Sequence, residues 1–313
     1  MKLPLRNRRT WSAVVSALAV LAVGFGPSVA RATPPAADEW AVEWTDGFDG
    51  RAGTAPDTEN WITDVGTGYP GGPPHWGTGE VQRYTADPAN LSQDGRGNLR
   101  ITPLRDNSGG WTSGRIETRR SDFRPPDGKK LRIEARIQLP AITGPTASGY
   151  WPAFWTLGKP FRTGEGVSPT VGEFDVLENA NGVNRIWGAM HCGTSEGGPC
   201  EESTGLAADT TCTGSTCTGR FHTYAVEWDR SARPERVSWY VDGRRYHSVS
   251  SAQMNEATWE AATGQGHFIL LNLAIGGGFP KAIAGHSTPT PQTRPGSSML
   301  VDHVTVLTTG ASE

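Results

Sequence analysis

The stretch LRIEARIQL, residues 131–139, alternates apolar and charged or polar side chains without a break. Leu131, Ile133, Ala135, Ile137 and Leu139 occupy the odd positions, and Arg, Glu, Arg and Gln lie between them. Because successive side chains of a strand point to opposite faces, this period of two predicts a β-strand with one buried face. Such a strand must pack its apolar face against another layer of structure.

Similar strand signals recur through most of the chain. They cover residues 114–119, 150–157, 185–191, 221–228, 267–278 and 299–307, and residues 237–249 are predicted to form a hairpin that turns at Asp242-Gly243. Only residues 250–262 suggest a helix. Gly (40) and Pro (23) make up about a fifth of the 313 residues, against a typical ~12%. Such a composition favours many short strands. We therefore expect an all-β sandwich or barrel.

The first 32 residues have the pattern of a secretory signal peptide. Basic residues precede an apolar run over residues 11–25, and Ala30-Arg31-Ala32 supplies a small-x-small cleavage site. The run is too short for a membrane span. Arg8-Arg9 leaves twin-arginine export open beside the ordinary route. We expect a secreted, extracellular protein with no membrane segment, in which residues 33–313 form one domain.

The charge balance argues against a nucleic-acid partner. Without the first 32 residues the chain has 24 Lys and Arg against 32 Asp and Glu, a net charge of −8. A nucleic-acid-binding protein normally carries a basic face, which this balance does not provide. No repeat and no low-complexity linker divides the chain, so a single domain is expected. We expect that domain to be a monomer.

All four cysteines lie in one Gly- and Thr-rich region of a chain that we expect to be exported. Four cysteines allow three pairings, and we expect the two local ones, Cys192 with Cys200 and Cys212 with Cys217. A zinc site is the alternative. Neither a Cys-x-x-Cys pair nor a neighbouring pair of histidines supports it.

A second stretch, GEFDVLENA at residues 172–180, places Glu173, Asp175 and Glu178 within six residues. In a regular strand Glu178 would lie on the opposite face from the other two, among apolar side chains, where an unpaired carboxylate is costly. One extra residue at Val176-Leu177, a β-bulge, would return Glu178 to their face. The sequence therefore predicts a bulged strand that aligns three acids.

Three aligned carboxylates have more than one possible use. Enzymes that hydrolyse a glycosidic bond typically use two carboxyl groups, one on each side of the bond. Crowding like charges raises at least one pKa, which keeps a proton donor available near neutral pH. A calcium loop is one alternative, although such loops carry Gly and Asn between their ligands rather than Phe, Val and Leu. A solvated polar face is the other, and the spacing alone leaves all three open.

The motif E-F-D-V-L-E resembles the E-x-D-x-x-E motif of glycoside hydrolase family sixteen, in its bulged, laminarinase-like form. Further segments resemble the family in the same order along the chain: WTDGFDG (44–50), WTSGRIETR (111–119), WPAFWTLG (151–158), FHTYAVEWD with WYVDG (221–229 and 239–243), NLAIGGGFP (272–280) and MLVDHVTV (299–306). The resemblance implies a concanavalin-like β-jelly-roll, a sandwich of two antiparallel sheets with a sugar cleft on its concave face.

Carried over residue by residue, the resemblance makes Glu173 the nucleophile, Asp175 an assisting acid and Glu178 the acid/base. It implies a retaining endo-hydrolase that works through a covalent glycosyl-enzyme and needs no organic cofactor. β-1,3-Glucan is the leading substrate. β-1,3-Galactan, a mixed-linkage glucan, transglycosylation and a non-catalytic glucan-binding lectin stay open. WGTGE (76–80) and the segment after His191 depart from the family pattern, and these departures bear on substrate choice.

The resemblance also implies residues around the acids and a metal ion. We expect substrate contacts from Glu80, Asn90, Arg115, Trp151, Trp155 and His191. Flat aromatic rings suit the apolar faces of sugars, but structural roles are the alternative for the tryptophans and for His191. For Arg115 the alternative is a salt bridge within the sheet. A structural calcium ion is expected on the convex face, at Gly47, Gly97 and Asp302.

Overall fold

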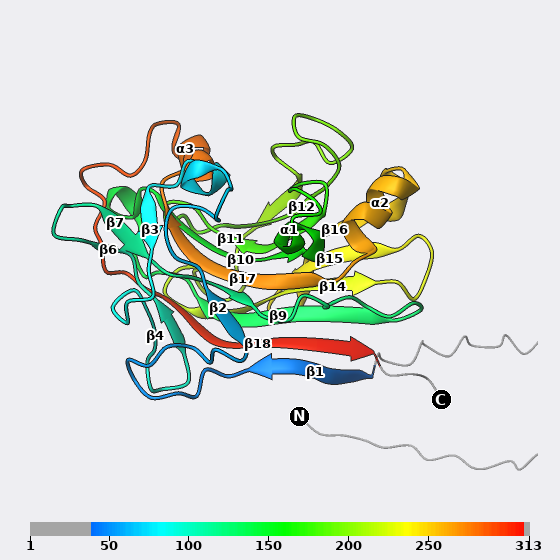
Figure 1. The fold of residues 1–313 in the computed structure, drawn as a ribbon, viewed down its shortest axis with the longest axis horizontal. Helices are drawn as coiled ribbons and strands as arrows, with labels where there is room; N and C mark the ends of the chain where they lie inside the picture. The colour runs from blue at the N-terminus through cyan, green and yellow to red at the C-terminus, as the bar shows by residue number, and fades with distance from the viewer. Residues whose placement is uncertain (1–38, 310–313) are drawn as a thin grey trace, which may run out of the picture. The chain divides into compact units, whose positions relative to one another are not determined.

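The computed structural model describes residues 39–309, which belong to one compact unit (Figure 1). The signal peptide expected at residues 1–32 lies outside the described residues. Within the described part, no helix is both long enough and apolar enough to span a membrane.

Two large antiparallel sheets make up most of the fold. In the order of their hydrogen-bonded neighbours, the first consists of β16 (Arg244–Ser250), β15 (Arg236–Val241), β14 (Phe221–Asp229), β9 (Lys130–Gln138), β18 (Met299–Thr309), β5 (Leu99–Ile101) and β4 (Leu91–Gln93), with β1 (Trp40–Asp46) also paired to β18. The second consists of β13 (Leu206–Thr210), β12 (Ile186–His191), β11 (Glu173–Glu178), β10 (Tyr150–Gly158), β17 (His267–Ile275), β8 (Arg115–Thr118) and β2 (Trp61–Thr63). The expected all-β jelly-roll sandwich is confirmed.

A third, small sheet was not anticipated. It consists of β3 (Gln82–Tyr84), β7 (Trp111–Ser113) and β6 (Leu104–Arg105), and β3 pairs with β7 in parallel. These strands have two or three residues each, too few for an alternating pattern to be recognised. The short strands β2, β4 and β5 escaped prediction for the same reason.

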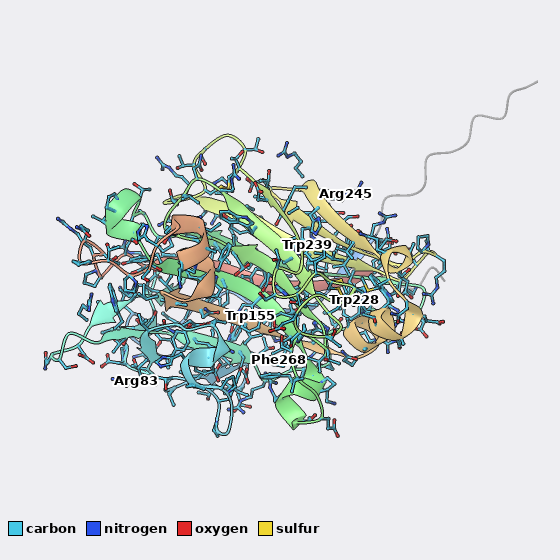
Figure 2. All side chains as sticks on the ribbon, turned by 90° about the horizontal axis from the view of Figure 1, so that it is seen from above. Arg83, Trp155, Trp228, Trp239, Arg245 and Phe268 are labelled. Atoms are coloured by element: carbon cyan, nitrogen blue, oxygen red, sulfur yellow. A yellow bond between two sulfur atoms is a disulfide. The ribbon has the colours of Figure 1, made fainter. Side chains whose placement is uncertain are left out.

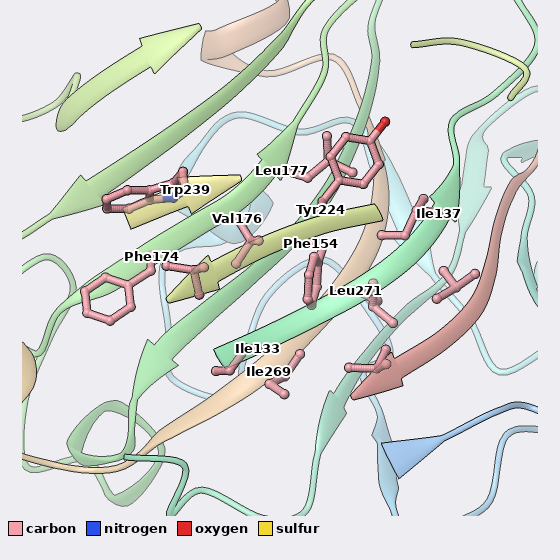
Figure 3. Close-up of a cluster of buried hydrophobic side chains, with 14 of the residues drawn as sticks. Ile133, Ile137, Phe154, Phe174, Val176, Leu177, Tyr224, Trp239, Ile269 and Leu271 are labelled. Atoms are coloured by element: carbon pink, nitrogen blue, oxygen red, sulfur yellow. The ribbon is translucent and has the colours of Figure 1, made fainter. Parts of the chain in front are cut away.

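The core lies between the two large sheets. On β9 the burial alternates as the sequence predicts, with Leu131, Ile133, Ala135 and Ile137 buried and the charged residues between them partly exposed. Figure 3 shows two of these residues with Phe154 and Leu271 of the second sheet in one buried cluster. Inward-facing residues of both sheets therefore share a single core, as in other aligned sandwiches.

Helices are few and short. The expected helix over residues 250–262 is present as the 3-10 turn η3 (Ser251–Gln253) followed by α2 (Glu256–Thr263). Two further short helices, α1 (Lys159–Thr163) and α3 (Gly278–Ala284), were not predicted, because neither is long enough to show a helical period. Two 3-10 turns, η1 (Pro74–Gly77) and η2 (Gly144–Ala147), complete the described helical segments.

Candidate active site

The three acids of residues 173–178 lie on β11, in the middle of the second sheet. Between Asp175 and Glu178 this strand advances by three residues while β12 advances by two, from Ala189 to Trp187. A matching shift occurs against β10, where the register leaves Val176 without a partner. The strand therefore contains one extra residue, and the bulge predicted at Val176-Leu177 is confirmed.

The bulge turns the acids and the apolar residues to opposite sides. Phe174, Val176 and Leu177 are all buried in the core, where Figure 3 shows them together. Glu173 and Glu178 are half-buried on the other face, which also carries Trp151 and Trp155 from β10. Figure 2, which is seen from above relative to Figure 1, labels Trp155 on this face.

A donor from the opposite sheet satisfies the main chain at the bulge. Trp239 of β15 reaches across the core and donates its indole N–H to the carbonyl oxygen of Asp175, at 2.8 Å. Gly188 of β12 makes room for this ring, because a Cβ there would lie 2.5 Å from Trp239 Cδ1. A buried carbonyl left without a donor would cost free energy, so this contact stabilises the irregular strand.

Glu178 is held by one tryptophan. Trp151 Nε1 donates to Glu178 Oε1 at 2.7 Å, a bond that favours the ionised carboxylate. Burial outweighs it and, with the charge of Asp175, raises the pKa of Glu178 to about 8. At neutral pH Glu178 is therefore mostly protonated, which is the state that a general acid requires.

Glu173 has a different donor. Ser168, in the loop between α1 and β11, donates its hydroxyl to Glu173 Oε2 at 2.9 Å. Burial and the nearby charge of Asp175 raise the pKa of Glu173 to about 7, whereas His191 and the Ser168 hydroxyl lower it. The pKa values of both glutamates are therefore raised, which keeps a proton donor available in the site near neutral pH.

Asp175 lies between the two glutamates and contacts His191 of β12. His191 Nε2 lies 3.1 Å from Asp175 Oδ2, and Nδ1 lies 2.8 Å from Glu202 Oε2. Burial disfavours the charged ring, but the hydrogen bonds to Asp175 and Glu202 outweigh that effect and raise the pKa of His191 to about 12. His191 is therefore an imidazolium that donates to a carboxylate on each side.

One group of side chains in the described part of the chain has the spacing to hold a metal ion. It is made of Glu173, Asp175 and His191, whose ligand atoms lie within 4.8 Å of one another. Both ring nitrogens of His191 donate protons to carboxylates, so neither has a lone pair for a metal. We assign no metal to this group.

An aromatic cluster borders Glu178. Phe279 of α3 packs against Trp151 at 5.7 Å and against Trp187 at 5.2 Å between ring centroids. Trp187 is the cross-strand partner of Glu178. This cluster contributes to the burial that raises the pKa of the acid. Stacking of Trp151 or Trp155 on a sugar stays a prediction.

Glu80 acts beneath the face that carries Trp155. Trp155 Nε1 donates to Asn272 Oδ1, Asn272 Nδ2 donates to the Tyr84 hydroxyl, and Tyr84 donates to Glu80 Oε2. Glu80 itself is buried. It anchors a chain of hydrogen bonds that orients Trp155, and it does not present a free group to a ligand.

Arg115 and Asn90 are also used within the fold. Arg115 is 4% exposed, and its Nε donates to Asp64 Oδ2 at 2.9 Å, which is the salt bridge that the sequence left as the alternative. Asn90 is 3% exposed, with its amide bonded to the Thr102 carbonyl and the Thr85 hydroxyl. Both residues therefore have contacts within the fold, and their expected sugar contacts stay predictions.

The three residues expected to hold calcium converge in the first sheet. Gly47 follows the β1 residue that pairs with Val304, and Gly97 precedes the β5 residue that pairs with Val301, so both flank Asp302 on β18. The carboxylate does not fit as it stands, because Arg136 and His303 donate to its two oxygens.

Both expected disulfides are present, Cys192–Cys200 and Cys212–Cys217. The sequence did not point to Ser168, Glu202 or Trp239, which contact the acid motif from distant segments. One signal was available for Glu202. Cys192 directly follows His191, so its disulfide returns the loop to the end of the strand that carries His191.

Comparison with known proteins gives one family. The model described as "Glycosyl hydrolases family 16" matches residues 95–273. The crystal structure of endo-1,3-β-glucanase from Streptomyces sioyaensis is 52% identical, with a TM-score of 0.85 over 90% of this chain and 99% of that chain. Glucan endo-1,3-β-glucosidase A1 of Niallia circulans is 29% identical over 89% of this chain. The chain spans only 39% of the length of that relative.

A further solved structure has a broader substrate description. It is a mutant of a non-specific endo-β-1,3(4)-glucanase of family GH16, co-crystallised with an oligosaccharide. It is 26% identical, with a TM-score of 0.65 over 88% of this chain and 97% of that chain.

Proposed function

This chain belongs to family 16 of the glycosyl hydrolases, and from that membership we propose that it is a secreted enzyme that cleaves β-1,3-glucan internally with retention of configuration. The observation that carries the proposal is the bulged strand, which puts two glutamates with raised pKa values and one aspartate on a single face. The high similarity to an endo-1,3-β-glucanase supports the choice of substrate.

In the proposed reaction Glu173 attacks the anomeric carbon while Glu178 protonates the departing oxygen. Glu178 then accepts a proton from the water that hydrolyses the glycosyl-enzyme. The raised pKa of Glu178 supports its role as the acid, and the Ser168 hydroxyl and the His191 cation support an ionised Glu173. Asp175, whose charge raises the pKa of both glutamates, would help to keep a proton in the site.

Two further parts of the proposal concern the setting of the enzyme. Two disulfides are typical of proteins from oxidising compartments, which supports export. We also propose a structural calcium ion where β1, β5 and β18 meet, for which Asp302 would exchange Arg136 for the ion. A chelator should then lower the unfolding temperature, and added calcium should restore it.

Mixed-linkage β-glucan is the second candidate substrate. The similarity to a non-specific endo-β-1,3(4)-glucanase favours it. Chain-length and linkage preferences depend on loops at the edge of the acid-bearing face rather than on β11, so the catalytic strand suits both substrates.

A panel of laminarin, lichenan, β-1,3-galactan, agarose and xyloglucan, with product sizing, tests the proposal. We expect short oligosaccharides to appear early from laminarin. Rapid cleavage of lichenan would favour the mixed-linkage alternative, and release of galacto-oligosaccharides with laminarin untouched would favour galactan. Binding of laminarin without any product would identify a lectin and contradict the proposal.

A further inference from the structure

We propose that Glu202, which lies outside the acid motif, is a positioning residue that fixes the His191 ring against Asp175. The inference deepens the proposed function and rests on it, because Asp175 has a catalytic task only if the three acids hydrolyse a glycosidic bond. Glu202 follows shortly after Cys200, whose disulfide to Cys192 ties this segment to the end of β12, so the segment would be part of the catalytic apparatus.

The contacts of Glu202 are directional and buried. Its side chain is 5% exposed, and its two oxygens accept from different donors. Oε2 accepts from His191 Nδ1 at 2.8 Å, and Oε1 accepts from the main-chain N–H of Cys192 at 3.1 Å. Because His191 Nε2 contacts Asp175, the imidazole lies between two carboxylates and can rotate away from neither without leaving a buried group unpaired.

The loop holds the ring at its face as well as at its edge. A Cβ on Gly205 would lie within 3.0 Å of three atoms of the His191 ring, so the main chain at Gly205 packs directly on the imidazole. Gly205 has a φ of +71°, which favours glycine. Glu202 is in turn tied to Gly197 by two main-chain hydrogen bonds of 2.6 and 2.7 Å within the loop. The ring is therefore clamped from two directions.

The charges around His191 explain why a carboxylate is needed at residue 202. Asp175 and Glu173 face the ring from β11, Glu202 faces it from the loop, and Glu178 lies close enough for the imidazolium to lower its pKa. A neutral residue in place of Glu202 would let His191 lose its proton more readily. The acids would then lose the cation that offsets their mutual repulsion.

The test compares Glu202→Gln with Glu201→Gln in the full mature enzyme. The two variants remove neighbouring carboxylates of the same loop, but Glu201 is exposed. Loss of a buried charged hydrogen bond predicts a kcat on laminarin lower by about tenfold or more in Glu202→Gln, with KM within about twofold. Glu201→Gln should keep wild-type kinetics, and both variants should retain the wild-type circular dichroism spectrum.

Nuclear magnetic resonance of the His191 ring supplies a readout that does not need activity. In the unmodified protein and in Glu201→Gln, both ring nitrogens should stay protonated from about pH 5 to 9, whereas Glu202→Gln should titrate within that range. A wild-type ring that titrates near its ordinary value would overturn the proposal even if Glu202→Gln failed to fold. So would a folded Glu202→Gln with unchanged kcat and ring signals. An enzyme inactive on every glucan would refute the proposed function but leave this titration test intact.

Discussion

Trp239 donates its indole N–H to the main-chain carbonyl of Asp175 at 2.8 Å, from the sheet opposite the one that carries the acids. The bonded carbonyl lies where the β11 ladder becomes irregular, between Asp175 and Glu178. The alignment of the three acids is therefore stabilised from within the core. A residue 64 positions away in the chain supports the catalytic strand without contacting substrate.

Trp239→Phe should weaken this support while keeping an aromatic ring in the core. Leaving the Asp175 carbonyl unpaired should lower the free energy of unfolding by about 1–3 kcal/mol, measured by urea denaturation. It should also lower kcat, because Glu178 depends on the bulge for its direction.

Trp228→Phe is the matched control for this change. Trp228 is also fully buried, but its Nε1 has no hydrogen-bond partner among the described residues. The Trp228→Phe variant should lose stability only because its core packs less well, and it should keep the wild-type kcat. Equal kcat losses in the two variants would argue that Trp239 acts only as core packing.

The prediction of the bulge succeeded because it rested on parity within nine consecutive residues. Strand alternation put Glu178 on the wrong face, and only an inserted residue could correct it. The contacts that hold the acids come from segments far away in the sequence. Ser168 and Glu202 come from loops, and Trp239 crosses the core, so no local period of the sequence encodes any of them.

The contacts of Arg115 and Asn90 within the fold could not be predicted, for one shared reason. Family likeness identified polar positions near the acid-bearing sheet, but it could not tell an outward side chain from one bonded within the fold. That distinction depends on partners such as Asp64 and Thr102, which lie 51 and 12 positions away in the chain. Short elements were missed for the simpler reason that a helix of five residues, such as α1, shows no period.

Ser168→Ala should shift the acid limb of the pH–rate profile upward. The Ser168 hydroxyl lowers the pKa of Glu173, so its loss raises that pKa above about 7 and leaves less carboxylate at any given acid pH. The profile of kcat/KM should therefore lose more activity at pH 6 than at pH 8. Thr170→Ala is a control, because Thr170 bonds the Gly193 carbonyl instead of an acid. A uniform loss at every pH would contradict this role of Ser168.

Glu178→Gln should be more stable than the wild-type protein at alkaline pH. The pKa of Glu178 rises from 4.5 to about 8 on folding, so the folded state holds a proton that the unfolded state releases. The wild type therefore loses stability as the pH rises from about 5 through about 8, and the glutamine variant avoids that loss. Unfolding temperatures across this range should diverge between the two proteins. Parallel curves would show that burial does not raise this pKa.

The two disulfides should differ in their effect on catalysis. Removing either pair by Cys→Ala double substitution should lower stability by roughly 2–3 kcal/mol, because each closes a small loop. Only loss of Cys192–Cys200 should also lower kcat, since Glu202, which contacts His191, follows shortly after the segment that this disulfide ties to β12. The variant without Cys212–Cys217 serves as the control. If both keep wild-type kcat, the loop is not needed to position His191.

The division of labour between the two glutamates is the central claim, and azide tests it through the anomer of the product. In Glu173→Gly the vacated space should admit azide, which would displace an activated β-fluoride once and give an α-glycosyl azide. In Glu178→Ala a substrate with a good leaving group should still form the glycosyl-enzyme, because such a group needs little protonation. Azide would then intercept it and give a β-glycosyl azide.

Nuclear magnetic resonance of the anomeric proton in these products is the decisive measurement. The account predicts the α-azide from Glu173→Gly, the β-azide from Glu178→Ala, and impaired hydrolysis with no azide product from Asp175→Asn. Exchanged anomers in the two glutamate variants would reverse their roles. An inverted hydrolysis product from the unmodified enzyme would contradict the covalent mechanism altogether.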